Sequence, residues 1–420
     1  MPHSAPLFTP VEWVDPEAAF LHLFADAADA FWLDAGIDAG TGWSWMGTGR
    51  LDPSSRAMEQ AVTAPGAAAG TAGSSVAGTA GAFRGGWVGW RSYEGESSWL
   101  RVDALLAFDH VSRRVYAVGD ASLAARVADA PTPPEAAPAP ARGTASARIT
   151  PDRYTALIEA CRDRIREGDA YQLCLTTRFT VPGAVDALAA FRRLRRASAS
   201  HHAGFVRIGD TTLVSASPER FLEVRDGAVH THPIKGTRPR SSDPERDAAL
   251  ADDLRTDAKE RAENVMIVDL MRNDLSRVCE PSTVGVDRLL EVETYRHVHQ
   301  LVSEVSGRLL PGTTLGGLLE ATFPAGSMTG APKQSAMQIL AGLEGSPRGL
   351  YAGAFGWIGD DGAADLAMVI RSIVVSPDAA SVGAGGGITW RSVAAAEVAE
   401  VGIKARAPLA ALGAEVPPGW

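Results

Sequence analysis

The sequence has few cysteines and no long apolar run. Only three cysteines occur in 420 residues, and they lie far apart, at Cys161, Cys174 and Cys279. An odd number of widely spaced cysteines excludes a disulfide framework and a cysteine-based zinc site, and is typical of a reducing compartment. No stretch is apolar over the roughly 20 residues that a membrane-spanning helix needs. The first residues, MPHSAPLFTPVEW, also lack the basic start of a signal peptide. We therefore expect a cytoplasmic protein that does not enter a membrane.

Positive charge is in short supply as well. The chain has 40 lysine and arginine residues against 50 aspartate and glutamate residues, which gives a formal net charge of -10. This balance excludes a bulk electrostatic attraction for nucleic acid or for an anionic membrane. A small anionic substrate would need a local basic site. Hydrophobic residues make up 45% and charged residues 21% of the chain, which are ordinary values for a globular protein.

Two low-complexity stretches suggest how the chain is divided. Residues 62–82 are rich in alanine, glycine and serine and predict a mobile loop, and residues 128–147 are rich in proline and alanine and predict a linker. The linker would separate an N-terminal lobe, residues 1–127, from a larger domain, residues 148–412. A chain of 420 residues is long enough for either part to contribute to a large core.

Helix and strand patterns are mixed without regular βαβ units. Asp226 and Gly227 stand between two alternating runs, and residues 360–362 (Asp-Asp-Gly) stand between two more, so both places predict hairpins. Antiparallel hairpins among amphipathic helices favour an α+β fold over a doubly wound one.

Two capping signals mark expected helix starts. Ser242 with Glu245, and Asp257 with Glu260, have the spacing of a capping box. We expect one helix to begin after each of them.

Two pairs of glutamates fall on predicted helices. Glu260 and Glu263 lie in KERAEN, and Glu397 and Glu400 have the same spacing in AAAEVAEVGIKAR. Residues at i and i+3 share one face of a helix. Two such pairs facing each other would repel unless they were protonated or bridged by a cation, and oxygen ligands of this kind suit Mg²⁺. The alternative is a pair of solvated helix faces.

One lysine stands at a predicted break in a strand. In HTHPIKGTRPR, residues 230–240, the pattern predicts that a strand ends near Ile234 and that Gly236 and Thr237 turn the chain. Lys235 is therefore a candidate base or nucleophile, because such a role needs a setting that a surface lysine does not. A structural lysine paired with a carboxylate is the alternative.

Glycines and basic residues near the C-terminus are candidates for an anion site. The glycines of SVGAGGGIT, after a predicted strand, would let backbone N–H groups approach an anion, although a flexible turn has the same composition. Arg371 lies in the apolar run MVIRSIVV and needs an anionic partner unless that strand is an edge strand. Lys404 follows Glu400 by four residues, which also fits a simple helix ion pair.

These segments together resemble the chorismate-utilising enzymes, a family that includes anthranilate, aminodeoxychorismate, isochorismate and salicylate synthases. The resemblance covers roughly residues 150 to 410 and rests on motifs in consistent order: ASPERF, PIKGTRPR, KERAENVMIVDLMRNDLSRV, VHQLVSEVSG, FPAGSMTGAPKQSAM, YAGAFGW, VIRS, GGGIT and EVAEVGIKAR. The N-terminal FWLDAG and GWSWMG resemble a weaker signature of the same family. The resemblance implies an α+β fold in which two antiparallel sheets pack as a sandwich with helices outside. It also implies that residues 148–412 are the catalytic, chorismate-binding domain.

The resemblance also implies a role for each candidate residue. It implies Mg²⁺ as the cofactor that holds the ring carboxylate of chorismate, with Glu263 and Glu400 as ligands and Glu260 and Glu397 as holders of metal-bound water. It implies that Glu219, in ASPERF, is the general acid for the leaving C4 hydroxyl. The implied substrate-binding residues are Thr329, Tyr351, Arg371, Gly385, Gly386, Gly387 and Lys404.

The lysine of PIKGT distinguishes members of the family. It is typical of those that make 4-amino-4-deoxychorismate, the precursor of 4-aminobenzoate, whereas anthranilate-forming members have alanine at the position of Lys235. The resemblance implies that Lys235 attacks C2 of chorismate and that ammonia then enters at C4. We expect burial and the nearby Mg²⁺ to favour the neutral amine, since a free lysine has a pKa of about 10.4. Gln172 stands where water-adding members carry a lysine base, which favours ammonia as the nucleophile. Gln300 stands where many members have histidine.

The nitrogen source and the competing interpretations complete the prediction. The sequence contains no GxCxG segment of a glutamine amidotransferase, so we expect ammonia to come from a separate amidotransferase subunit. The alternatives are an anthranilate-forming enzyme and a non-catalytic chorismate-binding partner of a glutaminase.

Overall fold

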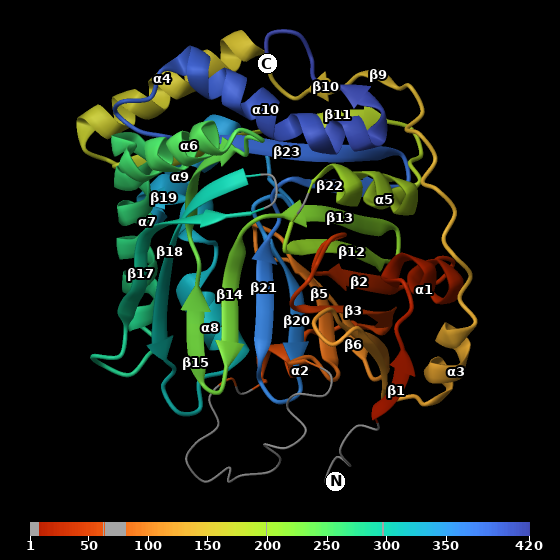
Figure 1. Ribbon diagram of the computed structural model, residues 1–420. Coiled ribbons are helices and arrows are strands. Elements are labelled where there is room, and N and C mark those ends of the chain that lie inside the picture. Colours follow the sequence, from red (N-terminus) through yellow and green to blue (C-terminus); the bar gives the residue numbers. More distant parts are fainter. Residues whose placement is uncertain (1–7, 62, 64–80, 199, 296–297) are drawn as a thin grey trace.

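The computed structural model describes residues 8–61, 63, 81–198, 200–295 and 298–420 (Figure 1). The loop predicted at 62–82 lies almost entirely outside the described residues. Within the described residues, no helix is long and apolar enough to cross a membrane.

One large antiparallel sheet combines strands from both ends of the chain. Within the described residues it has twelve strands. In spatial order they are β1 (Phe8–Glu12), β8 (Arg114–Val118), β7 (Leu105–Asp109), β3 (Trp43–Thr48), β2 (Ala30–Asp34), β12 (His202–Ile208), β13 (Thr211–Ser217), β22 (Ser372–Ser376), β23 (Ala379–Ile388), β11 (Gln172–Pro182) and β10 (Ser146–Ala147), with β19 (Gly330–Ala331) paired to β11.

A second antiparallel sheet, of ten strands in the described part of the chain, is built in the same way. Its order is β16 (Ile234–Pro239), β18 (Val298–Arg308), β15 (Ala228–Thr231), β14 (Arg220–Arg225), β21 (Ala364–Met368), β20 (Ala354–Gly359), β5 (Gly86–Arg91), β6 (Ser97–Val102) and β4 (Arg50–Asp52), with β17 (Gly285–Thr294) paired to β18. A short parallel pair joins β9 (Gly143–Thr144) to β24 (Ala414–Glu415).

The two sheets pack face to face. The cluster of buried residues between them draws on β2, β7, β12 and β13 of the twelve-stranded sheet and on β5, β6, β20 and β21 of the ten-stranded sheet. Its large side chains include Phe31, Phe355 and Trp357. In Figure 1 the strands of the first sheet run across the view and those of the second run up it. The predicted fold class, an α+β sandwich of two antiparallel sheets with flanking helices, is confirmed.

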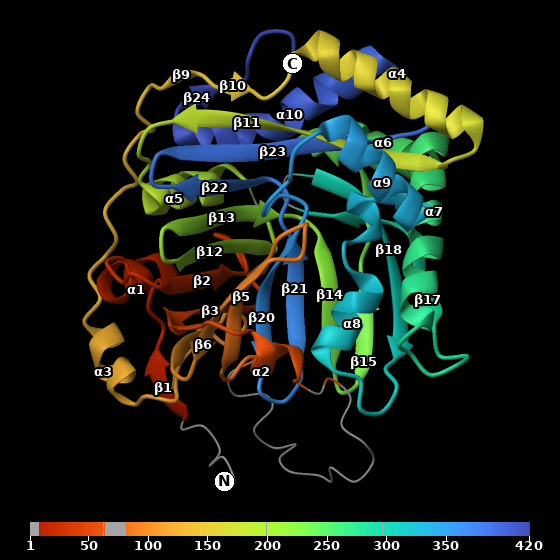
Figure 2. The ribbon, with the colours of Figure 1, turned by 180° about the vertical axis from the view of Figure 1, so that it is seen from behind.

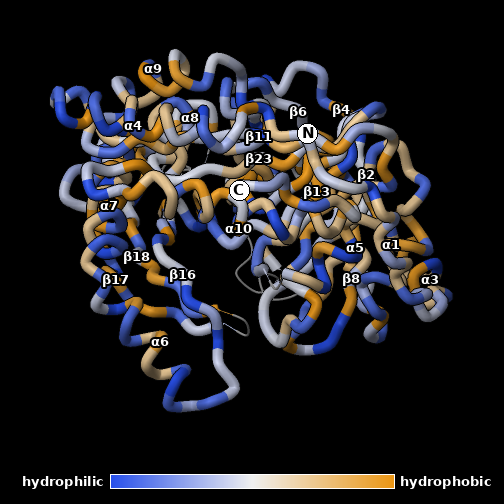
Figure 3. Tube along the Cα trace, turned by 90° about the horizontal axis from the view of Figure 1, so that it is seen from above, coloured by the Kyte–Doolittle hydropathy of each residue, from blue (hydrophilic) through white to orange (hydrophobic). Residues whose placement is uncertain are grey.

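Helices cover the outer faces. The helices near the twelve-stranded sheet are α1 (Pro16–Leu23), α3 (Ser122–Ala128), α4 (Pro151–Glu167), α5 (Ala187–Ala197) and α10 (Ala394–Leu412). Those near the ten-stranded sheet are α2 (Arg56–Glu59), α6 (Pro244–Thr256), α7 (Ala258–Ser276) and α8 (Leu315–Thr322), and α9 (Lys333–Glu344) packs on β11 and β19 of the first sheet. Figure 2 shows α8 on the back of the ten-stranded sheet and α9 above it, against the twelve-stranded sheet. Figure 3 shows hydrophobic residues along β11 and β23 and mostly hydrophilic ones along α6.

The segment predicted as a linker lies against the molecule. Residues 129–142 form no helix or strand. Arg192 on α5 donates to the carbonyl of Pro134, and Arg193 donates to the carbonyl of Ala137 over 3.3 Å. The division at residues 1–127, 128–147 and 148–412 stays a prediction. The structure adds that the chain on both sides of the segment supplies strands to both sheets.

Local sequence signals agree with the structure in most places. Both predicted hairpins form, between β14 and β15 and between β20 and β21. Asp257 caps α7 as predicted, accepting from the amides of Lys259 and Glu260. The other cap is wrong by one residue: Asp243, not Ser242, caps α6, because its carboxylate accepts from the Glu245 amide.

Candidate active site

The candidate site lies where the chain passes between the two sheets. Glu219 stands between β13 of the twelve-stranded sheet and β14 of the ten-stranded sheet. Arg371 stands between β21 of the ten-stranded sheet and β22 of the twelve-stranded sheet. The Met368 amide donates to the Glu219 carbonyl over 3.0 Å, so the two crossings are joined. The prediction that Arg371 lies within a strand is wrong, since it occupies the connection with φ of 52°.

The guanidinium of Arg371 forms no ion pair within the described residues. No hydrogen bond or ion pair of its side chain occurs in that part of the chain, although the residue is half-buried. Burial lowers the pKa of Arg371, against the opposing effects of Tyr351 and Glu400. A partly desolvated cation of this kind is suited to bind a small anion.

Lys235 lies on β16 at a bulge rather than at the end of a strand, so the predicted setting is wrong. The pairing of β16 with β18 shifts register next to Gly236, whose φ is 75°. A Cβ atom on Gly236 would lie 2.6 Å from Cδ1 of Leu254 and 3.0 Å from Cγ of Glu260. Glycine is therefore required both for the backbone angle and for the close approach of β16 to α6 and α7.

Carboxylates surround the Lys235 ammonium. Burial acts against its charge, but Glu263, then Glu219 and Glu260, raise the pKa of Lys235 overall. These carboxylates thus oppose the neutral amine that burial and Mg²⁺ are expected to favour. Burial raises the pKa of Glu219 despite the opposing charge of Lys235, so Glu219 is disposed to carry a proton.

Two helices bring the four glutamates to the same place. Glu260 and Glu263 lie near the start of α7, and Glu397 and Glu400 near the start of α10. Glu397 is 2% exposed and Glu263 is 7% exposed. Burial raises the pKa of Glu263 to about 7 and also raises that of Glu260.

Two lysines neutralise part of this negative charge. Lys259 Nζ is 3.1 Å from Glu397 Oε1 and 3.8 Å from Glu263 Oε1. Lys404 Nζ is 2.7 Å from Glu400 Oε1. Burial acts to raise the pKa of Glu400, but the contact with Lys404 holds that pKa below its usual value. The ion pair of Lys404 with Glu400 on the same helix, which the sequence spacing indicated, is therefore present.

The residues fit a divalent cation that prefers oxygen ligands. Glu263 Oε1 is buried and has no hydrogen-bond partner. A Cβ atom on Gly386 would lie 3.2 Å from Glu397 Oε2, and one on Gly387 would lie 3.6 Å from Glu263 Oε2, so glycines leave space beside both carboxylates. Among the described residues, no three of the four glutamates bring ligand atoms within 4.8 Å of one another. The donor set suits Mg²⁺, and Lys259 lies between two of its members.

The predicted substrate-binding residues gather around β23. The glycine run lies within this strand, not after it as predicted, and pairs with β11. The ring of Tyr351 packs on Gly383, where a Cβ atom would lie 2.1 Å from Cγ of the ring. Lys404 donates to the Gly385 carbonyl over 2.8 Å. The hydroxyl of Thr329 donates to the Ala325 carbonyl over 3.2 Å, which leaves it an acceptor role toward a ligand.

Two further residues belong to the site. Gln172 is fully buried, and neither amide atom has a partner. A Cβ atom on Gly387 would lie 2.4 Å from Gln172 Nε2, which places the amide against the glycine run. Lys259 was missed as a site residue, although its spacing of four residues before Glu263 in KERAEN is a signal for a contact.

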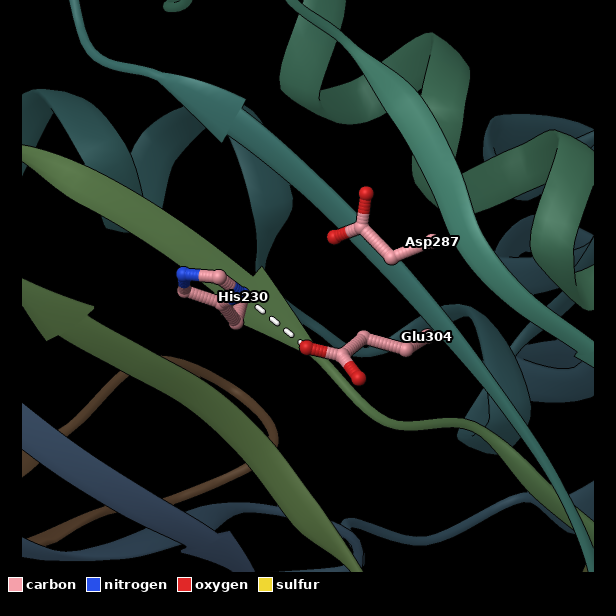
Figure 4. A group of neighbouring side chains, drawn as sticks. All are labelled: His230, Asp287 and Glu304. Atoms are coloured by element: carbon pink, nitrogen blue, oxygen red, sulfur yellow. Dashed lines mark hydrogen bonds and ion pairs between the residues drawn. The ribbon is translucent and has the colours of Figure 1, made fainter.

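A second group of potential ligands lies elsewhere on the ten-stranded sheet. Figure 4 shows His230, Asp287 and Glu304, whose ligand atoms lie within 4.8 Å of one another. Glu304 already binds His230 over 3.1 Å and Arg288 over 2.9 Å. Because protein cations and donors satisfy this carboxylate, we assign no metal to the group.

A cavity of about 670 Å³ is also separate from the candidate site. Asp34, His201, His202 and Trp357 are among its lining residues, and none of the predicted site residues lines it.

The sandwich and the cluster of carboxylates and lysines agree with a family match over most of the chain. Residues 47–410 match the family described as chorismate binding enzyme, and the chain belongs to this family.

Individual relatives carry two enzyme names. An aminodeoxychorismate synthase of Streptomyces pristinaespiralis is 38% identical, over 95% of this chain and 64% of the relative. Another, of Streptomyces griseus, is 37% identical over 95% of this chain and 63% of the relative. An anthranilate synthase component 1 of Streptomyces coelicolor is 39% identical over 79% of this chain and 73% of the relative. The chain thus spans somewhat less than two thirds of the length of the two aminodeoxychorismate synthases.

Solved structures share the fold along the whole chain. Anthranilate synthase component I from Streptococcus pneumoniae superposes with a TM-score of 0.71 at 29% identity, over 96% of this chain and 93% of that one. The menaquinone-specific isochorismate synthase of Escherichia coli superposes with a TM-score of 0.75 at 18% identity, over 97% of this chain and 95% of that one. The second likeness concerns the fold alone.

Proposed function

We propose that the protein aminates chorismate at C4 to give 4-amino-4-deoxychorismate, the precursor of 4-aminobenzoate. The names of the two relatives that align over 95% of the chain support this activity. The observation that carries it is the position of Lys235, half-buried at the β16 bulge, where Glu263 and Glu219 both act to raise its pKa. A nucleophile, an acid and a metal-binding carboxylate are the groups that such a substitution requires.

Lys235 and Glu219 would act in two balanced steps. In the first, the Lys235 amine forms a bond to C2, the two ring double bonds shift, and the C4–O bond breaks. Glu219 supplies the proton with which the hydroxyl leaves as water, a role for which its raised pKa is suitable. In the second step ammonia bonds to C4, the double bonds shift back, and the C2–Nζ bond breaks to release Lys235.

Glu263 and Glu400 would hold Mg²⁺ directly, and Glu260 and Glu397 would hold its water. When bound, Mg²⁺ would supply positive charge that fixes the ring carboxylate of chorismate. Glu263 is the charge that most raises the pKa of Lys235. Its engagement as a ligand would therefore lower that pKa and increase the fraction of neutral, nucleophilic amine.

Arg371, Tyr351, Lys404, Thr329 and the glycines of β23 would bind the substrate. The unpaired guanidinium of Arg371 suits a carboxylate of chorismate. The backbone of Gly385, Gly386 and Gly387 lets the substrate approach the strand closely, and a side chain at Gly387 would collide with Gln172.

The direct test is to identify the product. The full chain is incubated with chorismate, Mg²⁺ and ammonium, and we expect a non-fluorescent product with the mass of aminodeoxychorismate. When ammonium is omitted, intact-protein mass spectrometry should detect a covalent adduct equal to chorismate less one water, on the peptide that contains Lys235. A fluorescent anthranilate product without an adduct would refute the proposal.

A second candidate is anthranilate formation, which the identity of 39% to an anthranilate synthase component 1 favours. It would place nitrogen at C2 and would need no lysine nucleophile, so the same assay separates the two activities.

The nitrogen donor and compartment are part of the proposal. We expect ammonia to come from a separate glutamine amidotransferase subunit, and we expect the protein to work in the cytoplasm.

A further inference from the structure

Lys259 reaches from one glutamate-bearing helix to the other. It is the second residue of α7, and its Nζ donates to Glu397 Oε1 of α10 over 3.1 Å. The same Nζ lies 3.8 Å from Glu263 Oε1 on its own helix. The ammonium therefore contacts one carboxylate from each helix.

The two carboxylates are much less exposed than the lysine that joins them. The side chains of Glu263 and Glu397 are 9% and 3% exposed, whereas that of Lys259 is 39% exposed. Two buried like charges on facing helices repel each other unless a cation lies between them. Lys259 supplies that cation, and its exposed side chain has solvent into which it can withdraw.

Lys259 also lies where a shared metal ion would compete with it. Glu263 Oε1 accepts no hydrogen bond, and the contact with Lys259 is longer than a hydrogen bond. A cation bound by Glu263, with its water held by Glu397, would need both carboxylates that Lys259 contacts. Lys404 differs, because it is held at two points, by Glu400 over 2.7 Å and by the Gly385 carbonyl over 2.8 Å.

We propose that Lys259 is a displaceable counter-cation of the metal site. In the metal-free protein its ammonium holds Glu263 and Glu397 together, and it leaves Glu397 when Mg²⁺ enters. Lys259 thereby weakens Mg²⁺ binding and sets the concentration at which the site fills. This inference rests on the Mg²⁺ site of the proposed function.

The test compares Mg²⁺ binding by the full-length wild-type chain and variants, using titration calorimetry and thermal unfolding without substrate. Lys259→Met removes the competing charge and keeps the length of the side chain. We expect its Kd for Mg²⁺ to fall about tenfold, a change of about 1.4 kcal/mol. Its melting temperature without Mg²⁺ should fall, and the rise in melting temperature on adding Mg²⁺ should exceed that of the wild type.

Two controls make the result specific. Lys259→Arg retains the cation and should keep a Kd within about twofold of the wild type. Arg272→Met removes an exposed α7 cation whose ion pair, among the described residues, is with Asp269 at 3.4 Å, and it should leave the Kd unchanged. If Lys259→Met does not fold, Lys259→Gln is measured in its place, with the same tighter binding expected.

The outcomes separate the two proposals. An unchanged or higher Kd in Lys259→Met, with normal binding by the wild type, would overturn the counter-cation role and leave the Mg²⁺ site standing. Absence of Mg²⁺ binding by the wild type itself would remove the Mg²⁺ site of the proposed function, and this inference with it.

Discussion

At the scale of single residues, Lys235 has to combine two opposing requirements. The carboxylates near it raise its pKa and favour the charged form, whereas the proposed attack on chorismate would need the neutral amine. Burial acts toward the neutral form, and the proposed binding of Mg²⁺ would add to that effect.

Lys235→Met should reduce ammonia-dependent product formation by at least about 100-fold, because covalent catalysis is lost. Lys235→Arg keeps the positive charge but cannot be deprotonated, so it should lose activity to a similar extent. Rates are measured by mass spectrometry of the product, and circular dichroism checks the fold. Near wild-type turnover by the arginine variant would mean that position 235 supplies charge and not a nucleophile.

Glu263 would make the proposed Mg²⁺ binding sensitive to pH. Burial raises its pKa to about 7, so the carboxyl is protonated below that pH and cannot act as a ligand without losing a proton. We expect the Kd for Mg²⁺ to rise about tenfold between pH 8 and pH 6, measured by calorimetry. Glu263→Gln should bind weakly at both values, and a wild-type Kd independent of pH would contradict the prediction.

The same shift affects folding stability with a defined sign. Burial raises the pKa of the Glu263 carboxyl from its ordinary value of 4.5 to about 7, so the folded state binds the proton more tightly than the unfolded chain does. The contribution of Glu263 to stability therefore falls as the pH rises from about 4.5 to 7, and metal binding opposes this loss at higher pH.

At the scale of elements, the bulge of β16 connects the lysine to the helices. Gly236→Ala places a methyl group against Leu254 and Glu260 at a φ of 75°. We expect a loss of about 2–4 kcal/mol from the backbone strain and overpacking together. Activity should also fall, because the substitution moves Lys235 relative to α7.

The control for this substitution is Gly209→Ala in the turn between β12 and β13. Gly209 also has a positive φ, of 54°, but nothing lies within 4 Å of the added Cβ atom. Its cost should be about 1 kcal/mol from backbone conformation alone, with activity retained. Denaturant unfolding measures both variants, and equal losses would show that the contacts of Gly236 do not matter.

Local signals predicted these elements better than their connections. Asp226-Gly227 and the cap at Asp257 act over a few residues, and both were predicted correctly. The bulge at Lys235 and the crossing between the sheets at Arg371 were not predicted, because both features depend on strands that are distant in the sequence. Nothing in the alternation of β21 and β22 indicates that the chain changes sheets at Arg371.

The candidate site was predicted only in part, for a similar reason. Motif resemblance supplied Glu219, Lys235 and the glutamates, which the structure places at one junction. It gave no indication that Lys259 bridges the two helices, since that contact requires α7 and α10 to face each other.

At the scale of the whole molecule, both sheets depend on the N-terminal segment. β2 pairs with β12, and β5 pairs with β20. A chain beginning at residue 148 would leave the edges of β12 and β20 unpaired and would expose apolar residues between the sheets. We expect this truncated chain to aggregate or to lack cooperative thermal unfolding. A soluble, cooperatively unfolding fragment would contradict the prediction and support a separate domain.

The supply of nitrogen also belongs to this scale. Free ammonia is scarce at neutral pH because the ammonium ion dominates, so the proposed reaction would need a donor that delivers ammonia locally. The segment at 128–147 is unsuited to dock such a donor, since its backbone is bound to α5 through Arg192 and Arg193. We therefore expect the partner to bind a surface formed by the folded residues after this segment.

The purified chain should form product with ammonium at alkaline pH and almost none with glutamine. Addition of a glutamine amidotransferase subunit should give glutamine-dependent turnover. Rapid glutamine-dependent turnover by the purified chain alone would contradict the two-subunit arrangement, and mass spectrometry of the product with ¹⁵N-amide glutamine measures it directly.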